Sequence, residues 1–84
     1  MPSQYTRDEW AATLMVSGLS GEVSRGDLLS LFEVYGTINS IFRGKCSQGF
    51  AFVTFEDDSG VSEARRELNG YRFKGCTFDV RPAR

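Results

Sequence analysis

The stretch Gln-Gly-Phe-Ala-Phe-Val-Thr-Phe at residues 48–55 carries the clearest structural signal in the chain. Within residues 50–55, aromatic side chains alternate with small and aliphatic ones, and a period of two is typical of a β-strand. Successive side chains on a strand point to opposite faces of its sheet. One face of this strand is therefore predicted to carry Phe50 and Phe52, and the other Ala51, Val53 and Phe55.

The flanking sequence predicts three further strands. A run of β-favouring residues at 13–17 is closed by Gly18 and predicts the first strand. The second strand is expected at residues 38–42. The last is expected at residues 76–80 and is ended by Pro82.

Two segments have the spacing of amphipathic helices. Ser24 and Asp27 resemble a capping box, with Asp in place of the usual Glu, and open the first helix. Its apolar stripe consists of Leu28, Leu31, Phe32 and Tyr35, and Gly36 ends it. The second helix is expected to take its cap from residues 57–59. Its buried face consists of Val61, Ala64 and Leu68, and Asn69-Gly70 ends it.

The order of these elements predicts an α+β fold. It is a ferredoxin-like β-α-β-β-α-β sandwich, in which a four-stranded antiparallel sheet carries both helices on one face. Residues 1–11 show no periodicity and are expected to form a flexible leader, with the folded domain at residues 12–84. Two helices can cover only one side of the sheet, so the other side is predicted to be open.

Strand parity assigns the residues of the open face. Both Ile38 and Ile41 suit the helix side, which requires a bulge between them and turns Phe42 outward. Buried residues on the first and last strands are expected to be Leu14, Val16, Phe78 and Val80. The outward residues are then Met15, Ser17, Phe42, Phe50, Phe52, Thr77, Asp79 and Arg81. A soluble protein rarely leaves such an aromatic patch bare unless a partner binds there.

Composition restricts the function. The 84 residues include no histidine and only two cysteines, which excludes His-based catalysis and a Cys/His zinc cluster of the usual spacing. We expect no enzyme activity, cofactor, membrane segment or small-molecule substrate. No signal-peptide pattern is present, so an intracellular protein with reduced thiols is expected.

The charge is unevenly distributed along the chain. The net charge is −1, which is not the basic balance of a typical nucleic-acid binder. Residues 1–42 carry two basic and five acidic groups, whereas residues 43–84 carry eight basic and six acidic ones. A phosphate-facing surface is therefore expected to come from the second half of the chain.

Residues 48–55 resemble the longer signature of the RNA recognition motif, with Gln48 where Lys or Arg is usual. Residues 14–19 resemble its shorter signature, with Met15 in place of an aromatic residue and Gly18 in place of Asn. The first such motif of SR-type splicing factors is similar at residues 49–57 and 66–70, at Gly75-Cys76, and in the short link between the second and third strands.

The resemblance implies a single-stranded RNA-binding module in mRNA processing or splicing, with a nuclear location favoured over a cytoplasmic or mitochondrial one. By family position, the residues expected to stack on bases are Phe50, Phe52, Phe42 and Met15. Those expected at phosphates are Arg43, Lys45, Gln48, Arg81 and Arg84, and base edges would be read by Ser17, Thr77 and Asp79.

A protein-binding variant of the same fold is the alternative. The acidic balance, Met15 and Gln48 favour it, and Leu29 and Val34 project from the core stripe of the first helix, where a protein partner or a second copy could dock. One protein-binding branch of the family carries Arg-x-Phe after the second helix. Residues 71–73 are Tyr-Arg-Phe, so the required arginine is missing.

Overall fold

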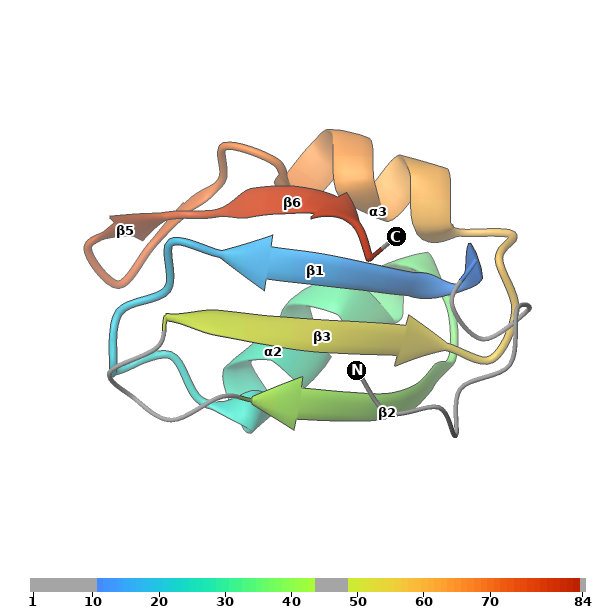
Figure 1. Ribbon diagram of the computed structural model, residues 1–84, viewed down its shortest axis with the longest axis horizontal. Helices are drawn as coiled ribbons and strands as arrows, with labels where there is room; N and C mark the ends of the chain where they lie inside the picture. The colour runs from blue at the N-terminus through green and yellow to red at the C-terminus, as the bar shows by residue number, and fades with distance from the viewer. Residues whose placement is uncertain (1–10, 44–48, 84) are drawn as a thin grey trace.

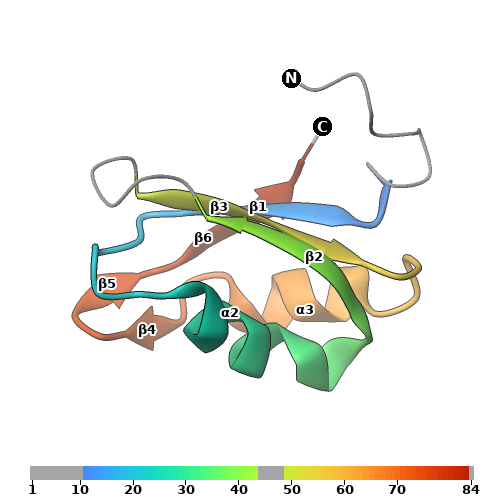
Figure 2. The ribbon, with the colours of Figure 1, turned by 90° about the horizontal axis from the view of Figure 1, so that it is seen from below.

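The computed structural model describes residues 11–43 and 49–83. Its elements are β1 (Thr13–Ser17), α2 (Arg25–Phe32), a short 3₁₀ helix η1 (Glu33–Tyr35), β2 (Ile38–Arg43), β3 (Phe50–Phe55), α3 (Val61–Leu68), β4 (Arg72–Phe73), β5 (Cys76–Thr77) and β6 (Asp79–Pro82). Four strands form an antiparallel sheet in the order β2-β3-β1-β6 (Figure 1). Both helices lie against one face of this sheet (Figure 2), which confirms the predicted fold. The expected leader, apart from Ala11, lies outside the described residues.

The core lies between this sheet and the two helices. Its buried residues include Leu14, Val16, Ala51, Val53 and Phe55 from the strands and Leu28, Phe32, Ala64 and Leu68 from the helices. The predicted bulge is present, because the β2–β3 register shifts between Ile38 and Ser40. The shift lets both Ile38 and Ile41 pack against the core, although three positions separate them.

The first helix begins as predicted. The Ser24 hydroxyl accepts a hydrogen bond from the Asp27 N–H, and the Asp27 carboxylate accepts one from the Ser24 N–H, both at 3.1 Å. Lys74, in the turn between β4 and β5, places its Nζ 2.8 Å from Asp27 Oδ2. This ion pair joins the hairpin to the start of α2.

The second helix begins differently from the prediction. Its N-cap is Gly60 and no side chain caps it, so the cap expected from residues 57–59 is wrong. The Asp57 carboxylate instead accepts hydrogen bonds from the N–H and hydroxyl of Ser59. A Cβ at Gly60 would overlap the carbonyl oxygen of Tyr35, so the close approach of η1 requires glycine at this position.

The last predicted strand is divided in two. β5 pairs with β4 in a separate hairpin, and β6 alone joins the main sheet and continues to Pro82. Phe78 separates them because its N–H and C=O bond to Tyr71 and Gly70 rather than to a strand. Phe78 and Val80 are buried as predicted, but Thr77 belongs to the hairpin and not to the sheet face.

Replacement of Gly60 tests the contact with η1. Gly60→Ala is expected to lower the free energy of unfolding by about 3 kcal/mol, near the upper end of over-packing costs, because the methyl group meets rigid backbone. Gly26→Ala in α2 is the control, since its Cβ would lie 3.7 Å from the nearest atom, Ser24 Oγ. It is expected to raise stability by up to about 1 kcal/mol. Urea unfolding measures both, and equal effects would contradict this account.

The ion pair of Asp27 predicts a pH dependence. Hydrogen bonds from Lys74 and from the Ser24 N–H hold the pKa of the Asp27 carboxyl below its ordinary 3.8. A lowered folded-state pKa contributes stability that is complete above the unfolded-state pKa and lost as the pH falls through the folded-state pKa. Asp27→Asn should therefore destabilise the protein at neutral pH and lose this effect well below pH 3.8. Urea unfolding at neutral pH and well below pH 3.8 measures the loss of stability caused by the substitution. An equal loss at both pH values would exclude the carboxylate charge as its cause.

Candidate nucleic-acid interface

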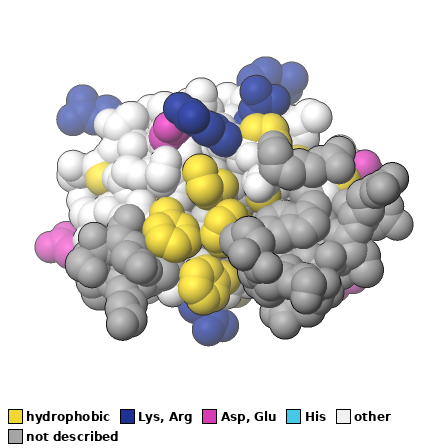
Figure 3. Space-filling view, viewed as in Figure 1, with side chains coloured by type: hydrophobic (Ala, Val, Ile, Leu, Met, Phe, Trp, Pro, Cys, Tyr) yellow, Lys and Arg dark blue, Asp and Glu magenta, His cyan; other side chains and the backbone are white. Residues whose placement is uncertain are grey.

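Three phenylalanine rings lie together on the sheet face that the helices leave uncovered. The ring centroids of Phe42 and Phe50, and of Phe42 and Phe52, are 6.3 Å apart, and those of Phe50 and Phe52 are 5.7 Å apart. β2–β3 pairing places Phe42 opposite Phe52, and Phe50 follows two positions away on the same face. Phe42 is 54% exposed and the other two are half-buried. Figure 3 shows hydrophobic side chains gathered at the centre of this face.

Met15 and Arg81 extend this cluster across the sheet. Met15 of β1 is paired with both Phe52 of β3 and Arg81 of β6, so the four strands contribute one continuous row beginning at Phe42. In the next row, Ser17 lies between Phe50 and Asp79. The structure thus brings seven predicted site residues to one face: Met15, Ser17, Phe42, Phe50, Phe52, Asp79 and Arg81.

Arg81 and Asp79 form an ion pair at the β6 edge of this face. Arg81 Nε and Nη2 lie 3.2 and 3.1 Å from the two carboxylate oxygens of Asp79. Both side chains are exposed, and exposed pairs are worth at most about 1 kcal/mol, so a phosphate can compete for the guanidinium. Ser17 Oγ lies 3.5 Å from the Asp79 carbonyl.

Arg43, which was expected to contact a phosphate, does not lie on the open face of the sheet. It follows Phe42 on β2 and is paired with the buried Ala51, so it points to the helix side of the sheet. Its guanidinium donates hydrogen bonds to the carbonyls of Ser20, Val23 and Phe50 at 3.0–3.1 Å. These contacts depend on loop positions that strand parity alone does not give.

Of the remaining predicted site residues, the structure describes one, and it lies apart from this cluster. Thr77 is exposed in the β4–β5 hairpin. Lys45, Gln48 and Arg84 lie outside the described residues, so their phosphate contacts stay predictions.

The cluster has a polar boundary that the sequence reasoning did not include. Thr13 and Thr54 share the outward parity of Met15 and Phe52, and their hydroxyl oxygens lie 3.0 Å apart. Both side chains are buried, so they offer little surface to a ligand. Alternation continued by one step from Phe52 would have identified Thr54.

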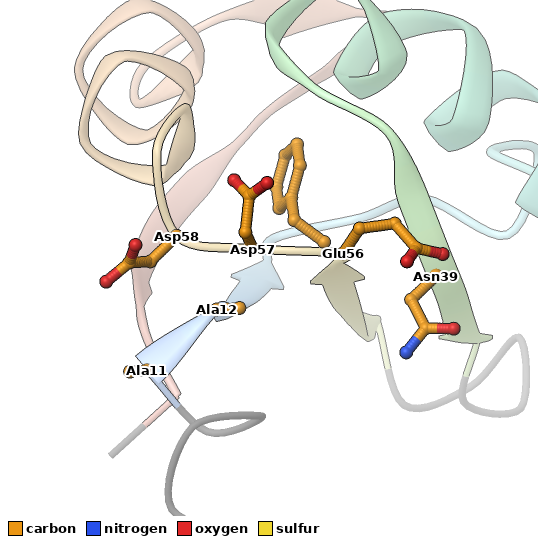
Figure 4. A pocket seen from close by; sticks show the side chains of 7 residues that line it. Ala11, Ala12, Asn39, Glu56, Asp57 and Asp58 are labelled. Carbon is orange, nitrogen blue, oxygen red and sulfur yellow. The ribbon is translucent and has the colours of Figure 1, made fainter.

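An acidic hollow lies at the far end of β3. Glu56, Asp57 and Asp58 line it together with Asn39, and their carboxylates point in different directions (Figure 4). The hydrogen bonds from Ser59 hold the pKa of Asp57 below its ordinary value. Among the described residues, no group of His, Cys, Asp or Glu side chains is arranged to hold a metal ion. This end of the sheet carries negative charge that disfavours phosphate.

Within the described residues, no helix has the length and apolarity that crossing a bilayer requires.

An open antiparallel sheet with adjacent exposed rings defines a class of domain that can stack unpaired bases. The family model described as RNA recognition motif matches residues 14–79. The chain therefore belongs to the RNA recognition motif family.

Known proteins resemble most of this chain. A component of eukaryotic translation initiation factor 3 from Nematostella vectensis is 36% identical over 95% of the chain, and RNA binding protein fox-1 homolog 3 of Homo sapiens is 35% identical over 98%. The chain spans only 29% and 27% of these two relatives. Among solved structures, the C. elegans NONO-1 homodimer matches all of the chain and 32% of its own, with a TM-score of 0.83 and 25% identity.

Proposed function

We propose that this chain binds single-stranded RNA on the sheet face that carries Phe42, Phe50 and Phe52. The observation that carries the proposal is the contact of these three rings on a face that no described helix covers. Unstacked bases present flat π-faces that such rings can hold, and membership of the family supports RNA as the ligand.

Each apolar residue of the face has its own role. Phe52 lies under one base, Phe42 under its neighbour, and Phe50 beside a base or between sugars. Each stack contributes about 1–3 kcal/mol to binding. Met15 takes the fourth position, where its thioether packs on a base without the quadrupole of a ring, so this subsite is weaker and orients the base less.

Polar groups complete the proposed site. Arg81 contacts a phosphate after exchanging its Asp79 partner, and the freed carboxylate and Ser17 Oγ read base edges. Lys45, Arg84 and Gln48 supply further phosphate contacts, as the family pattern implies. The acidic hollow at Glu56 directs the sugar–phosphate chain toward the opposite end of the sheet.

Removal of two rings tests the stacking proposal. Phe50→Ala combined with Phe52→Ala should weaken binding of a short random RNA by about 2–6 kcal/mol, the value of two stacks. Fluorescence anisotropy with a labelled oligonucleotide measures the affinity. Tyr71→Ala is the aromatic control, because Tyr71 packs on Phe73 and Phe78 away from the sheet face. A folded double variant that binds like the parent would refute stacking.

A protein-docking role is the second candidate, favoured by the exposure of Leu29 (41%) and Val34 (76%). Leu29 lines a hollow with Ile38 and Ile41 between α2 and β2, and the NONO-1 neighbour is described as a homodimer. A chemical-shift titration with RNA distinguishes the two. Shifts on β1, β2 and β3 support RNA on the sheet. If the chemical shifts of the strand residues do not change with RNA, and those of α2 change with protein concentration, self-association is the function in place of RNA binding.

The cellular process that we propose is mRNA processing, with a nuclear location. The resemblance to SR-type splicing factors supports it, whereas the match to a component of a translation initiation factor supports translation. Crosslinking in cells, with the protein expressed at its full natural length, separates the two. Reads that cross intron boundaries are expected, and reads confined to spliced messages would overturn the assignment to processing. Phe50→Ala with Phe52→Ala is the control for crosslinks that depend on the sheet.

A further inference from the structure

The guanidinium of Arg43 joins three segments of backbone at one end of the sheet. Arg43 Nε lies 3.0 Å from the Val23 carbonyl oxygen, Nη2 lies 3.0 Å from that of Ser20, and Nη1 lies 3.1 Å from that of Phe50. Ser20 and Val23 belong to the β1–α2 connection, and Phe50 begins β3. One side chain of β2 therefore links its own strand, the next strand and the connection before α2.

A second contact fixes the start of β3 to the same connection. The Leu19 N–H donates a hydrogen bond to the Gly49 carbonyl at 3.0 Å. Gly49 has φ +65°, and a Cβ there would lie 3.0 Å from the Leu19 carbonyl oxygen, so the two segments approach closely. The backbone immediately before Phe50 and the carbonyl of Phe50 itself are thus both held.

The backbone that these hydrogen bonds fix carries two rings of the aromatic cluster. Phe50 is bonded to Arg43 through its carbonyl, and Phe42 is the residue before Arg43 on β2. The rings of Phe42 and Phe50 lie on the open face, whereas the Arg43 side chain lies on the opposite one. Arg43 therefore acts on two of the three rings from behind the sheet.

We propose that Arg43 is a positioning residue for RNA binding, which fixes Phe42 and Phe50 as a preformed platform and does not neutralise a phosphate. This inference rests on the proposed RNA-binding function of the same face. In this role Arg43 must donate hydrogen bonds in fixed directions, and a positive charge alone is not sufficient. A planar guanidinium can donate to three carbonyls in fixed directions, whereas the ammonium of lysine is a point charge on a flexible stem.

A comparison of Arg43→Lys with Arg43→Gln distinguishes positioning from phosphate contact. If Arg43 holds the backbone, both variants should bind short RNA about tenfold more weakly, on the order of one lost stack. The slope of log K against log salt should stay at the parent's value in both. The affinity is measured by anisotropy at several salt concentrations, with folding checked by circular dichroism. Arg65→Lys and Arg65→Gln are matched controls on the exposed side of α3 and should leave affinity and slope unchanged.

The opposite results would overturn the inference. A phosphate contact predicts that Arg43→Lys binds like the parent and that Arg43→Gln lowers the salt slope by about 0.7, the value for one phosphate of a single strand. Folded variants that both bind like the parent would show that the contacts serve stability alone. A parent protein that does not bind RNA would refute the proposed function itself. A parent that binds RNA, together with an Arg43→Lys variant of equal affinity, would refute only the positioning role of Arg43.

A measurement on the parent decides the question if both variants unfold. The Arg43 Nε–H resonance is observed by ¹⁵N NMR during an RNA titration. A proton bonded to the Val23 carbonyl should exchange slowly with solvent, and its shift should stay constant while the Phe50 and Phe52 amides move. A large shift of the Arg43 Nε–H at saturating RNA would assign this group to phosphate and overturn the inference.

Discussion

The register of β2 on β3 is the constraint on which the binding face depends. Ile38 and Ile41 both pack against the core although they are three positions apart, and this is possible only because one extra residue is accommodated between Ile38 and Ser40. The same shift places Phe42 opposite Phe52 on the open face. Without the bulge, Ile38 and Ile41 would lie on opposite faces. Burial of Ile38 would then turn Phe42 inward, and the aromatic cluster would have two members instead of three.

Local patterns predicted the parts of the fold that depend on local chemistry. β1 and β3 begin and end at the predicted residues, and the capping box at Ser24 forms, because alternation and capping involve neighbours in sequence. The start of α3 at Gly60 could not be predicted in this way, since the determining atom is the carbonyl oxygen of Tyr35, 25 positions earlier. The β4–β5 hairpin was missed because its turn places Lys74, an unusual residue for this conformation, at φ 50° before Gly75.

The candidate site shows the same division between local and long-range effects. Strand parity brought Met15, Phe42, Phe50 and Phe52 to one face, because orientation on a strand needs only the alternation of residues. The same parity rule turns Arg43 away from that face. Parity does not predict its hydrogen-bond partners, however, because the acceptor carbonyls of Ser20 and Val23 are 23 and 20 positions distant in the sequence. A basic residue beside an aromatic one is compatible with a phosphate contact, and only the position of the β1–α2 connection reveals the other use of its charge.

The charge of the molecule is consistent with a face that works by stacking. Arg43 donates to backbone, Lys74 is paired with Asp27, and Arg81 is paired with Asp79, so each of these cations has a partner within the chain. In the proposed binding mode, the share of RNA affinity that comes from ring–base contact depends little on salt, unlike the share from phosphate contacts. A net charge of −1 is therefore compatible with RNA binding, provided that Phe42, Phe50 and Phe52 are held in place before the RNA arrives. In the proposed binding mode, preorganisation of the rings, and not an excess of cations, is what this fold supplies to the ligand.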